Sequence, residues 1–526
     1  MIVRVGPQEM PAGTASALYL DYLEGYEKAR AFFPYGPHDL GAALAARRAY
    51  SYPRAEVVPL LRAYNAGLGA SARALANIEA LADQETTCVI TGQQAGFLAG
   101  PAYTVHKIAT TIRLAAHVQA SFNVRCVPIF WLATEDHDFG EINHAYLVQR
   151  DGEVGRVGFG WSQKGRPVAA LPVDERVMRA FDAYWAKAAA GPYLDETREQ
   201  FAPRSGEGYA SWNARLWSEL FAEQGLVIVE PRTIRPAAGA FFSRALRQSG
   251  EIRRRLDEVS RQLAEAGYTP QLQSESAGQL FTFDRWGYRV RADDPERHVE
   301  DSAVRPERYS TDAALRPLFA DAMLPAVASV LGPGETAYQG MLRPLYELFE
   351  VPQPHLFPRK SYTLVGAKEA ERIAAYGMTV QEILRGEVSP DNVMGALVPA
   401  EERRVFEAAE SAIAAALAPM RLHLVARDPR LGRTTAQHVA RTQRNFAELK
   451  VRAYRSRLRQ MGYSRGELRA LRNALLPRGR LQERVLPLPH FMVRHGRALL
   501  AVLLSAGELE DYSHNILVLD GEHACA

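Results

Sequence analysis

The sequence predicts an α/β protein built on a parallel sheet, followed by a long helical hairpin. Short, continuous apolar runs alternate with stretches of helical periodicity from residue 86 to about 363, as in βαβ units. After residue 367 the helical periodicity continues without strands between. The 526 residues are too many for one core, so we expect two to four domains.

The expected elements follow the chain in order. Residues 8–82 have mostly helical character, and the α/β core begins near residue 86. Strands are expected at 86–91, 126–133, 226–230, 325–331 and 355–363, and helices at 102–120, 237–266 and 335–350. Two stretches interrupt this alternation and are interpreted as insertions: 145–222, with a hairpin at 146–161, and 271–317, with a hairpin at 280–290.

The helical region contains two long amphipathic stretches joined near residues 428–432. Their apolar positions recur at helical spacing: Phe406, Ile413, Leu417, Met420 and Leu424, then Val439, Thr442, Phe446, Leu449 and Ala453. This pattern predicts an antiparallel, coiled-coil-like hairpin, with a kink or break at Pro419. Its apolar face needs a cover, which a second copy or the rest of this chain can supply.

These observations divide the chain into four segments. They are an N-terminal helical segment (1–84), an α/β core with its insertions (85–366), a helical hairpin domain (367–480) and a C-terminal segment that returns to the core (481–526).

A glycine-rich turn follows the first strand of the core. Gly92, Gly96 and Gly100 are spaced four apart, and Pro101 is expected in the first turn of the following helix. A strand, a glycine turn and a helix N-terminus together form a cradle for a phosphate or carboxylate. The spacing matches neither G-x-G-x-x-G nor G-x-x-x-x-G-K-[ST], so an anion site and a plain βα turn both remain open.

Acids and histidines crowd the end of the second strand. Four acidic residues and two histidines fall within residues 135–144. Such charges repel unless a cation, a substrate amine or shared protons offset them, although a solvated loop is the alternative. His137, Glu141 and His144 have the spacing of one helix face, which leaves a metal site open, but we expect no metal held by the protein.

Composition excludes several classes of protein. Three cysteines form neither a disulfide framework nor a zinc pattern, no apolar run has the length of a membrane span, and no signal layout is present, so we expect a cytoplasmic protein. The net charge of +3 hides a basic block at 427–484 with sixteen Lys/Arg and four Asp/Glu. A nucleic acid or an acidic protein face would suit this block; we expect no nucleic-acid partner.

Several segments, taken together, resemble the bacillithiol biosynthesis cysteine-adding enzyme family (BshC). They span about residues 85–485: Thr91-Gly92-Gln93-Gln94-Ala95-Gly96, Gly100-Pro101-Ala102-Tyr103-Thr104-Val105-His106-Lys107, Ala133-Thr134-Glu135-Asp136-His137-Asp138, Leu315-Arg316-Pro317-Leu318, Leu331-Gly332-Pro333-Gly334-Glu335-Thr336-Ala337-Tyr338 and Leu481-Gln482-Glu483-Arg484. The first eighty residues and the 145–222 insertion carry little of the resemblance.

The resemblance implies an amide-forming carbon–nitrogen ligase that adds cysteine to glucosaminyl-malate in the last step of bacillithiol synthesis. It also implies a Rossmann-like core similar to nucleotidyltransferases and a homodimer through the coiled coil. Because a free carboxylate must be activated before it forms an amide, we expect ATP with Mg²⁺ as cosubstrate. A nucleotidyltransferase acting on a small metabolite and a non-catalytic nucleotide-binding scaffold remain alternatives.

The expected site gathers residues from four segments. Lys107 and the turn supply an anion-binding wall, and Arg359 and Lys360 meet phosphate from the other side. Asp136, His137 and Asp138 hold a substrate ammonium, with His137 as general base. The catalytic residues are expected to be His137, Asp136, Asp138 and Lys107. The expected binding residues are Gly92, Gln93, Gln94, Gly100, Tyr103, Thr104, Glu135, Gly334, Glu335, Thr336, Tyr338, Arg359 and Lys360.

Overall fold

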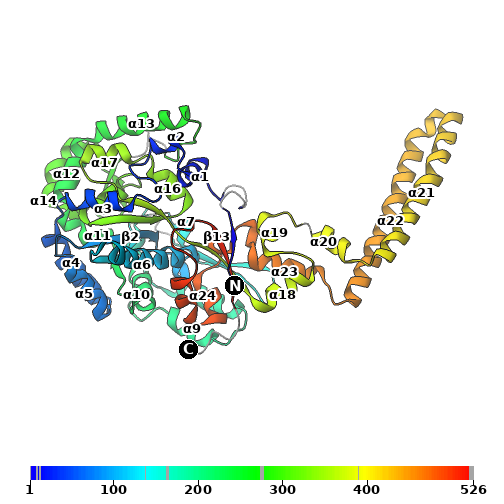
Figure 1. Cartoon of the computed structure of the whole chain (residues 1–526), viewed down its shortest axis with the longest axis horizontal. Coiled ribbons are helices and arrows are strands. Elements are labelled where there is room, and N and C mark those ends of the chain that lie inside the picture. Colours follow the sequence, from blue (N-terminus) through cyan, green and yellow to red (C-terminus); the bar gives the residue numbers. More distant parts are fainter. Residues whose placement is uncertain are drawn as a thin grey trace.

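The structure is a computed structural model that describes residues 2–6, 10, 14–136, 138–161, 165–272, 278–388 and 390–519. A rounded body holds the sheets, and the helices α21 (Ala400–Arg427) and α22 (Gly432–Gln460) project from it as an arm (Figure 1). Within the described ranges, no helix has both the length and the apolar character needed to cross a bilayer.

The central sheet has five strands, all parallel, in the order β11-β10-β2-β3-β6. These strands are β2 (Thr87–Gln94), β3 (Cys126–Ala133), β6 (Val227–Val229), β10 (Ala326–Leu331) and β11 (His355–Pro358). The chain first winds outward from β2 through β3 to β6, then crosses over to β10 and β11 on the other side. The direction of winding therefore reverses between β2 and β10, as in a Rossmann-like fold. The predicted α/β class with a parallel sheet is confirmed.

Helices cover both faces of this sheet, so its strands are buried on both sides. All eight residues of β3 are buried. Ile129 and Trp131 face the layer formed by α4, α12 and α15, whereas Phe130 and Leu132 face the layer of α6 and α10. These helices are α4 (Arg54–Gly67), α6 (Tyr103–Phe122), α10 (Tyr209–Leu220), α12 (Gly239–Arg247) and α15 (Leu315–Met323).

A second sheet joins the two ends of the described chain. β1 (Ile2–Val5) pairs antiparallel with β13 (His514–Leu519), and β13 pairs parallel with β12 (Ser361–Gly366). The single strand expected at 355–363 is therefore wrong: β11 and β12 belong to different sheets. The turn at Arg359 and Lys360 separates them, because both side chains bond to the C-terminal segment.

The interrupting segments form small layers of their own. β4 (His144–Val148) and β5 (Val154–Gly158) make a hairpin, followed by α8 (Glu175–Lys187) and α9 (Leu194–Phe201). The second segment carries a three-stranded sheet of β7 (Leu280–Phe283), β8 (Arg289–Arg291) and β9 (Tyr309–Thr311), with α14 (Val299–Val304). Both expected hairpins are present.

Two helices expected in the body are each divided into two shorter ones. The helix expected at 237–266 is divided into α12 and α13 (Ser249–Glu265), and that at 335–350 into α16 (Pro333–Gln339) and α17 (Arg343–Phe349). Pro344 lies in the first turn of α17, where its missing N–H costs nothing. The others are α1 (Ala17–Glu24), α2 (Glu27–Arg30), α3 (Leu40–Arg48), α5 (Ala72–Ala80), α7 (Phe139–Ile142), α11 (Pro231–Ile234), α24 (Leu488–His495) and α25 (Ala498–Ser505).

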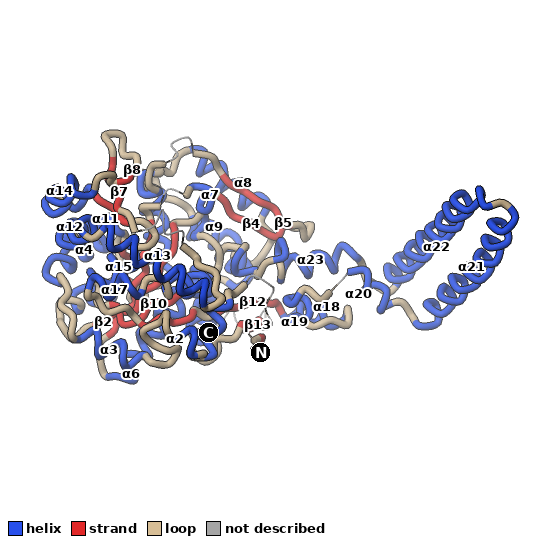
Figure 2. The backbone as a smooth tube through the Cα atoms, turned by 90° about the horizontal axis from the view of Figure 1, so that it is seen from above, coloured by secondary structure: helices blue, strands red, loops and turns tan. Residues whose placement is uncertain are grey.

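The arm is an antiparallel helical hairpin, as predicted (Figure 2). It joins the body through α18 (Ala367–Ala375), α19 (Val380–Arg385), α20 (Pro390–Leu397) and α23 (Arg465–Leu475). The ring of Phe406 packs on Phe446 and Tyr454, with centroids 6.0 and 5.3 Å apart. The helix α21 continues through Pro419, so no break occurs there. Leu449, expected on the inner seam, is exposed.

Candidate functional site

A cavity of about 470 Å³ opens where the direction of winding reverses, beyond the carboxyl ends of β2 and β10. Ligands of open α/β sheets bind at such points, because the loops on either side diverge there. The glycine-rich turn after β2 reaches this cavity through Gly92, and a second turn after β10, Gly332-Pro333-Gly334, reaches it through Gly334. Residues from the ends of β2 and β3 and from the two helices beside β10 line it, among them Gly92, Gln93, Gln94, Trp131, Arg316, Gly334, Glu335 and Tyr338.

Lys107 lies buried between the two turns, behind the cavity wall. Its ammonium lies 2.7 Å from a Glu335 oxygen and donates to the Gly92 carbonyl (2.6 Å) and to Oε1 of Gln93 (3.2 Å). The other Glu335 oxygen accepts the backbone N–H of Gly332 at 2.8 Å, which caps α16. Burial lowers the pKa of Lys107, and the carboxylate of Glu335 opposes this effect. A cation is thereby fixed behind the cavity wall.

The glycine turn and the acidic segment meet at this site. The side-chain amide of Gln94 donates to a carboxylate oxygen of Asp136 at 3.0 Å. Arg316 lies 3.9 Å from the same carboxylate. A second cavity, of about 330 Å³, continues past Asp136 and shares Arg316 with the first. The position predicted for His137 lies outside the described residues.

The other acids of this segment have separate partners. Glu135 is buried and forms an ion pair with Arg235. Asp138 caps α7, because its Oδ1 accepts the Gly140 N–H at 3.1 Å. Glu141 lines the cavity, and burial followed by the nearby carboxylates raises its pKa. The expected catalytic role of Asp138 is therefore corrected to that of a helix cap. Glu141, which was not among the expected site residues, lines the cavity instead.

The glycine turn is not an open cradle. Gly96 and Gly100 pack so closely that a Cβ on Gly96 would lie 2.6 Å from the Cα of Gly100. The helix α6 starts at Tyr103, so Pro101 precedes it rather than lying in its first turn. The N–H of Ala102 already donates to the Leu486 carbonyl at 2.8 Å. The expected use of this helix N-terminus as the main anion site is therefore corrected.

Four expected binding residues lie away from the cavity wall. Thr104 and Thr336 are fully buried, and the Thr336 hydroxyl donates to the Gly332 carbonyl. Arg359 and Lys360 are turned toward the C-terminal segment instead of toward phosphate. Lys360 donates to the carbonyls of Glu508 and Asp511, and burial lowers its pKa to about 8.

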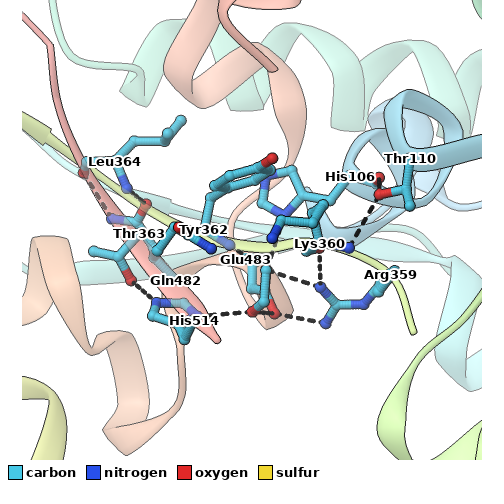
Figure 3. A network of polar contacts seen from close by, with 12 residues as sticks. His106, Thr110, Arg359, Lys360, Tyr362, Thr363, Leu364, Gln482, Glu483 and His514 are labelled. Atoms are coloured by element: carbon cyan, nitrogen blue, oxygen red, sulfur yellow. Dashed lines mark hydrogen bonds and ion pairs between the residues drawn. The ribbon is translucent and has the colours of Figure 1, made fainter. Parts of the chain in front are cut away.

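Arg359 belongs to a buried network centred on Glu483 (Figure 3). One Glu483 oxygen accepts from Arg359 (2.6 Å) and Ser361 (2.8 Å). The other accepts from Arg359 (3.0 Å), from the Tyr362 N–H (3.2 Å) and from His106 of α6 (2.8 Å). Burial acts to raise the pKa of Glu483, but the charge of Arg359 and the bond from His106 hold it well below its usual range. The network joins α6, β12 and the C-terminal segment.

Tyr103 and Gly100 border a neighbouring hollow, and Tyr338 lies at the main cavity. The Tyr103 hydroxyl accepts from the Gln93 amide at 3.1 Å, and burial raises the pKa of Tyr103 to about 12. The helix spacing that left a metal site open does not hold. Glu141 and His144 do not share a helix, because α7 ends at Ile142 and His144 begins β4. In the described part of the chain, no group of three or more His, Cys, Asp or Glu side chains is arranged to hold a metal.

Sequence reasoning missed Arg316. It occurs in the segment Leu315-Arg316-Pro317-Leu318, which carries part of the family resemblance but no local pattern that indicates a binding site. Its place in α15, opposite Asp136, depends on the crossover that brings β10 beside β2.

Comparison with known proteins gives one consistent result. A family model described as "Bacillithiol biosynthesis BshC, N-terminal Rossmann-like domain" matches residues 6–360, and one described as "Bacillithiol biosynthesis BshC, C-terminal coiled-coil domain" matches residues 362–519. Three similar relatives bear the name "Putative cysteine ligase BshC". The relative from Geobacillus kaustophilus is 29% identical over 97% of this chain and 99% of its own length. That from Solibacter usitatus is 28% identical (95% and 97%), and that from Heliobacterium modesticaldum 30% (90% and 93%).

Proposed function

Because this chain belongs to the BshC family of bacillithiol biosynthesis, we propose that it is an ATP-dependent ligase that couples cysteine to the amine of glucosaminyl-malate. The observation that carries the proposal is the cavity at the ends of β2 and β10, which brings a fixed ammonium, an arginine and a carboxylate to one place. Amide formation needs these charges. An activated carboxyl group carries negative charge that cations stabilise, and the attacking amine must lose a proton.

The proposed roles follow from the positions of the side chains. Arg316 in the cavity wall and the buried Lys107 behind the wall stabilise the negative charge of the activating phosphate. Asp136, oriented by Gln94, binds the substrate ammonium. The amine nitrogen bonds to the carboxyl carbon of cysteine, one carboxylate oxygen leaves with the phosphate or adenylyl group, and the amine proton passes to a base. His137 is proposed for that last role from the sequence alone.

The direct test is turnover. The purified protein is incubated with ATP, Mg²⁺, cysteine and glucosaminyl-malate, and the thiol product is measured together with AMP and ADP. Product with AMP supports activation by adenylation, and product with ADP supports an acyl phosphate. Absence of product, with pyrophosphate released onto another acceptor, supports a nucleotidyltransferase instead.

His137→Ala tests the proposed base. We expect loss of product formation without loss of the folded state, as measured by turnover and thermal unfolding. His438→Ala, an exposed position on α22, is the matched control and should retain full activity. Unchanged turnover in His137→Ala would remove His137 from the mechanism.

We further propose that the arm makes the protein a homodimer. Three apolar side chains of the arm are largely exposed: Leu422 (72%), Val405 (63%) and Leu449 (57%). Among the described residues, neither α21 nor α22 covers them. Exposed apolar side chains at this density on a projecting hairpin favour a partner surface, and a second copy offers an identical hairpin.

A further inference from the structure

A second hollow, of about 360 Å³, adjoins the main cavity. The two share Gln93, Gln94 and Glu141, so a ligand that passes these side chains enters both. Its far wall comes from a different part of the chain. That wall carries Arg478, Arg480 and Arg484 from the segment after α23, facing His144 and Tyr146 of β4.

The three arginines are exposed and have no carboxylate partner among the described residues. Elsewhere on this protein, exposed arginines pair with neighbouring acids, as Arg254 does with Glu251 and Glu258. Arg478 is also held in an unusual way. Its backbone has φ of 56°, in the left-handed region that costs a non-glycine residue about 1 kcal/mol or more, and its guanidinium stacks 4.7 Å above the Tyr146 ring.

Arg484 is held in place by its neighbours in sequence. Gln482 bonds to both the N–H and the carbonyl of Leu364, at 2.6 and 3.1 Å, as a strand residue would. Glu483 accepts five hydrogen bonds in the buried network of Figure 3. The next residue, Arg484, emerges from this fixed turn at the wall of the hollow. A cation on such a rigid mount needs little ordering when it binds an anion.

The charges facing the hollow do not cancel. Among the described residues that line it, three guanidinium groups meet one carboxylate, that of Glu141. His144 adds no acid, and burial, then Arg156 and Arg478, lower its pKa. The hollow therefore carries a net charge of about two positive units at neutral pH, and planar guanidinium forks match carboxylate oxygens in pairs.

We propose that Arg478, Arg480 and Arg484 form a subsite for the dicarboxylate end of the acceptor substrate. The amine end of the same molecule then extends past Gln93 and Gln94 into the main cavity, toward Asp136 in the wall of the cavity that adjoins it at Arg316. This inference rests on the proposed function, which supplies an acceptor with a malyl group. The two carboxylates balance the excess charge of the hollow.

The experiment compares two acceptors and two variants. Arg478→Gln and Arg484→Gln are assayed with glucosaminyl-malate and with methyl glucosaminide, which lacks the carboxylates; Arg452→Gln, exposed on α22, is the control. Each site variant should raise KM for glucosaminyl-malate about 10- to 100-fold, the loss of one charge-assisted contact, with KM for ATP and cysteine unchanged. Methyl glucosaminide should be used equally poorly by the wild type and both variants.

Free malate and inorganic phosphate separate this inference from its alternatives. In calorimetry with the wild-type protein, malate should bind and Arg478→Gln should abolish that binding. If the variants instead raise KM for ATP, or if phosphate binds and malate does not, the hollow holds nucleotide phosphate and the inference is wrong. If the wild type forms product and the variants match it, the inference fails while the proposed function stands. If no product forms but malate binding still requires Arg478, the subsite stands and the proposed function fails.

Discussion

Lys107 is the single residue that most directly tests the proposed chemistry. Replacement by Met keeps the shape of its buried stem but removes the charge behind the cavity wall. We expect kcat to fall about 100-fold or more, because a fixed cation no longer meets the developing negative charge. Folding should change little, since Glu335 is partly exposed and can be solvated in the variant. Steady-state kinetics and thermal unfolding measure the two effects.

The control for this variant is Lys187→Met, which removes an exposed lysine from α8. It should leave kcat and the melting temperature unchanged. Equal activity of the Lys107 variant and this control would show that the buried ammonium only supports the turn.

Gly96 is the residue on which the shape of the turn depends. A Cβ at this position meets the backbone of Gly100 at 2.6 Å, so Gly96→Ala forces the two segments apart. We expect a loss of about 1–3 kcal/mol in the free energy of unfolding, measured with urea. Gly250→Ala, in α13 with open space around the new methyl group, should be neutral or stabilise the protein by up to about 1 kcal/mol. Equal stability of both variants would contradict the close packing described here.

At the scale of elements, the turn of Glu483 fixes β12 to α6. Glu483→Gln leaves the buried guanidinium of Arg359 without its counter-charge, so we expect a loss of about 3–5 kcal/mol in unfolding free energy. Glu467→Gln breaks a similar two-bonded pair with Arg372 that is about one-third exposed, and should cost about 1 kcal/mol or less. Chemical denaturation of both variants gives the comparison. Similar losses for the two would show that burial does not strengthen the dependence on Glu483.

The arm is the element that tests the proposed dimer. Charged side chains at Leu422 and Leu449, introduced together as Leu422→Arg and Leu449→Arg, should convert a dimer into a monomer, because guanidinium groups oppose burial of the shared apolar surface. Light scattering after size-exclusion chromatography measures the mass. Val304→Arg, which alters an equally exposed valine in α14 of the body, should leave the mass unchanged. A monomeric wild type would contradict the proposal.

The sequence predicted helices and strands correctly where the local residue pattern determines them. It failed at boundaries that contacts with distant segments determine. The continuous apolar run of β3 predicted its bounds correctly, because a strand buried on both faces needs no alternation. The run at 355–363 looks like one strand, yet bonds from Arg359 and Lys360 to the C-terminal segment turn the chain between β11 and β12. Pro419 predicted a kink or break, and α21 continues through it without a break.

At the scale of the whole molecule, the free energy of unfolding should fall as the pH becomes acidic. Burial lowers the pKa of His355 and His514 to about 4 and that of His490 to about 3, against about 6.5 in the unfolded chain. Between pH 6.5 and 4 the unfolded chain binds protons that the folded chain does not, so stability falls as pH falls. Each such proton contributes about 1.4 kcal/mol per pH unit.

Three acids act against this trend. Burial raises the pKa of Asp321 to about 6 and also raises the pKa values of Asp312 and Glu141, so the folded chain takes up these protons first. Six histidines with lowered pKa values outweigh the three carboxyls, and denaturation at pH 7, 6 and 5 should show a steady loss of unfolding free energy. A flat profile would mean that the histidines titrate normally and are less enclosed than described.

The site was predictable to the extent that it follows from the order of strands. Parallel strands end at one edge, so the glycine turn after β2 and the acids after β3 were expected to meet, and Gln94 bonds to Asp136. The hollow lined by Arg478 was not predictable from the sequence. Its arginine wall follows the arm in the chain and lies more than three hundred residues from β4, which forms the opposite wall. Arg359 and Lys360 were misjudged for the same reason: their partner, the C-terminal segment, carries no local signal beside them.

The pairing of β1 with β13 has a consequence for how the chain is made. Ile2 aligns with Leu517, so β1 has no antiparallel neighbour until β13 has been synthesised, more than five hundred residues later. The arm and the central sheet emerge before then and can fold in the meantime. Closure of the small sheet therefore waits for β13, and a ribosome stalled before residue 514 would hold a nascent chain in which β1 is still unpaired.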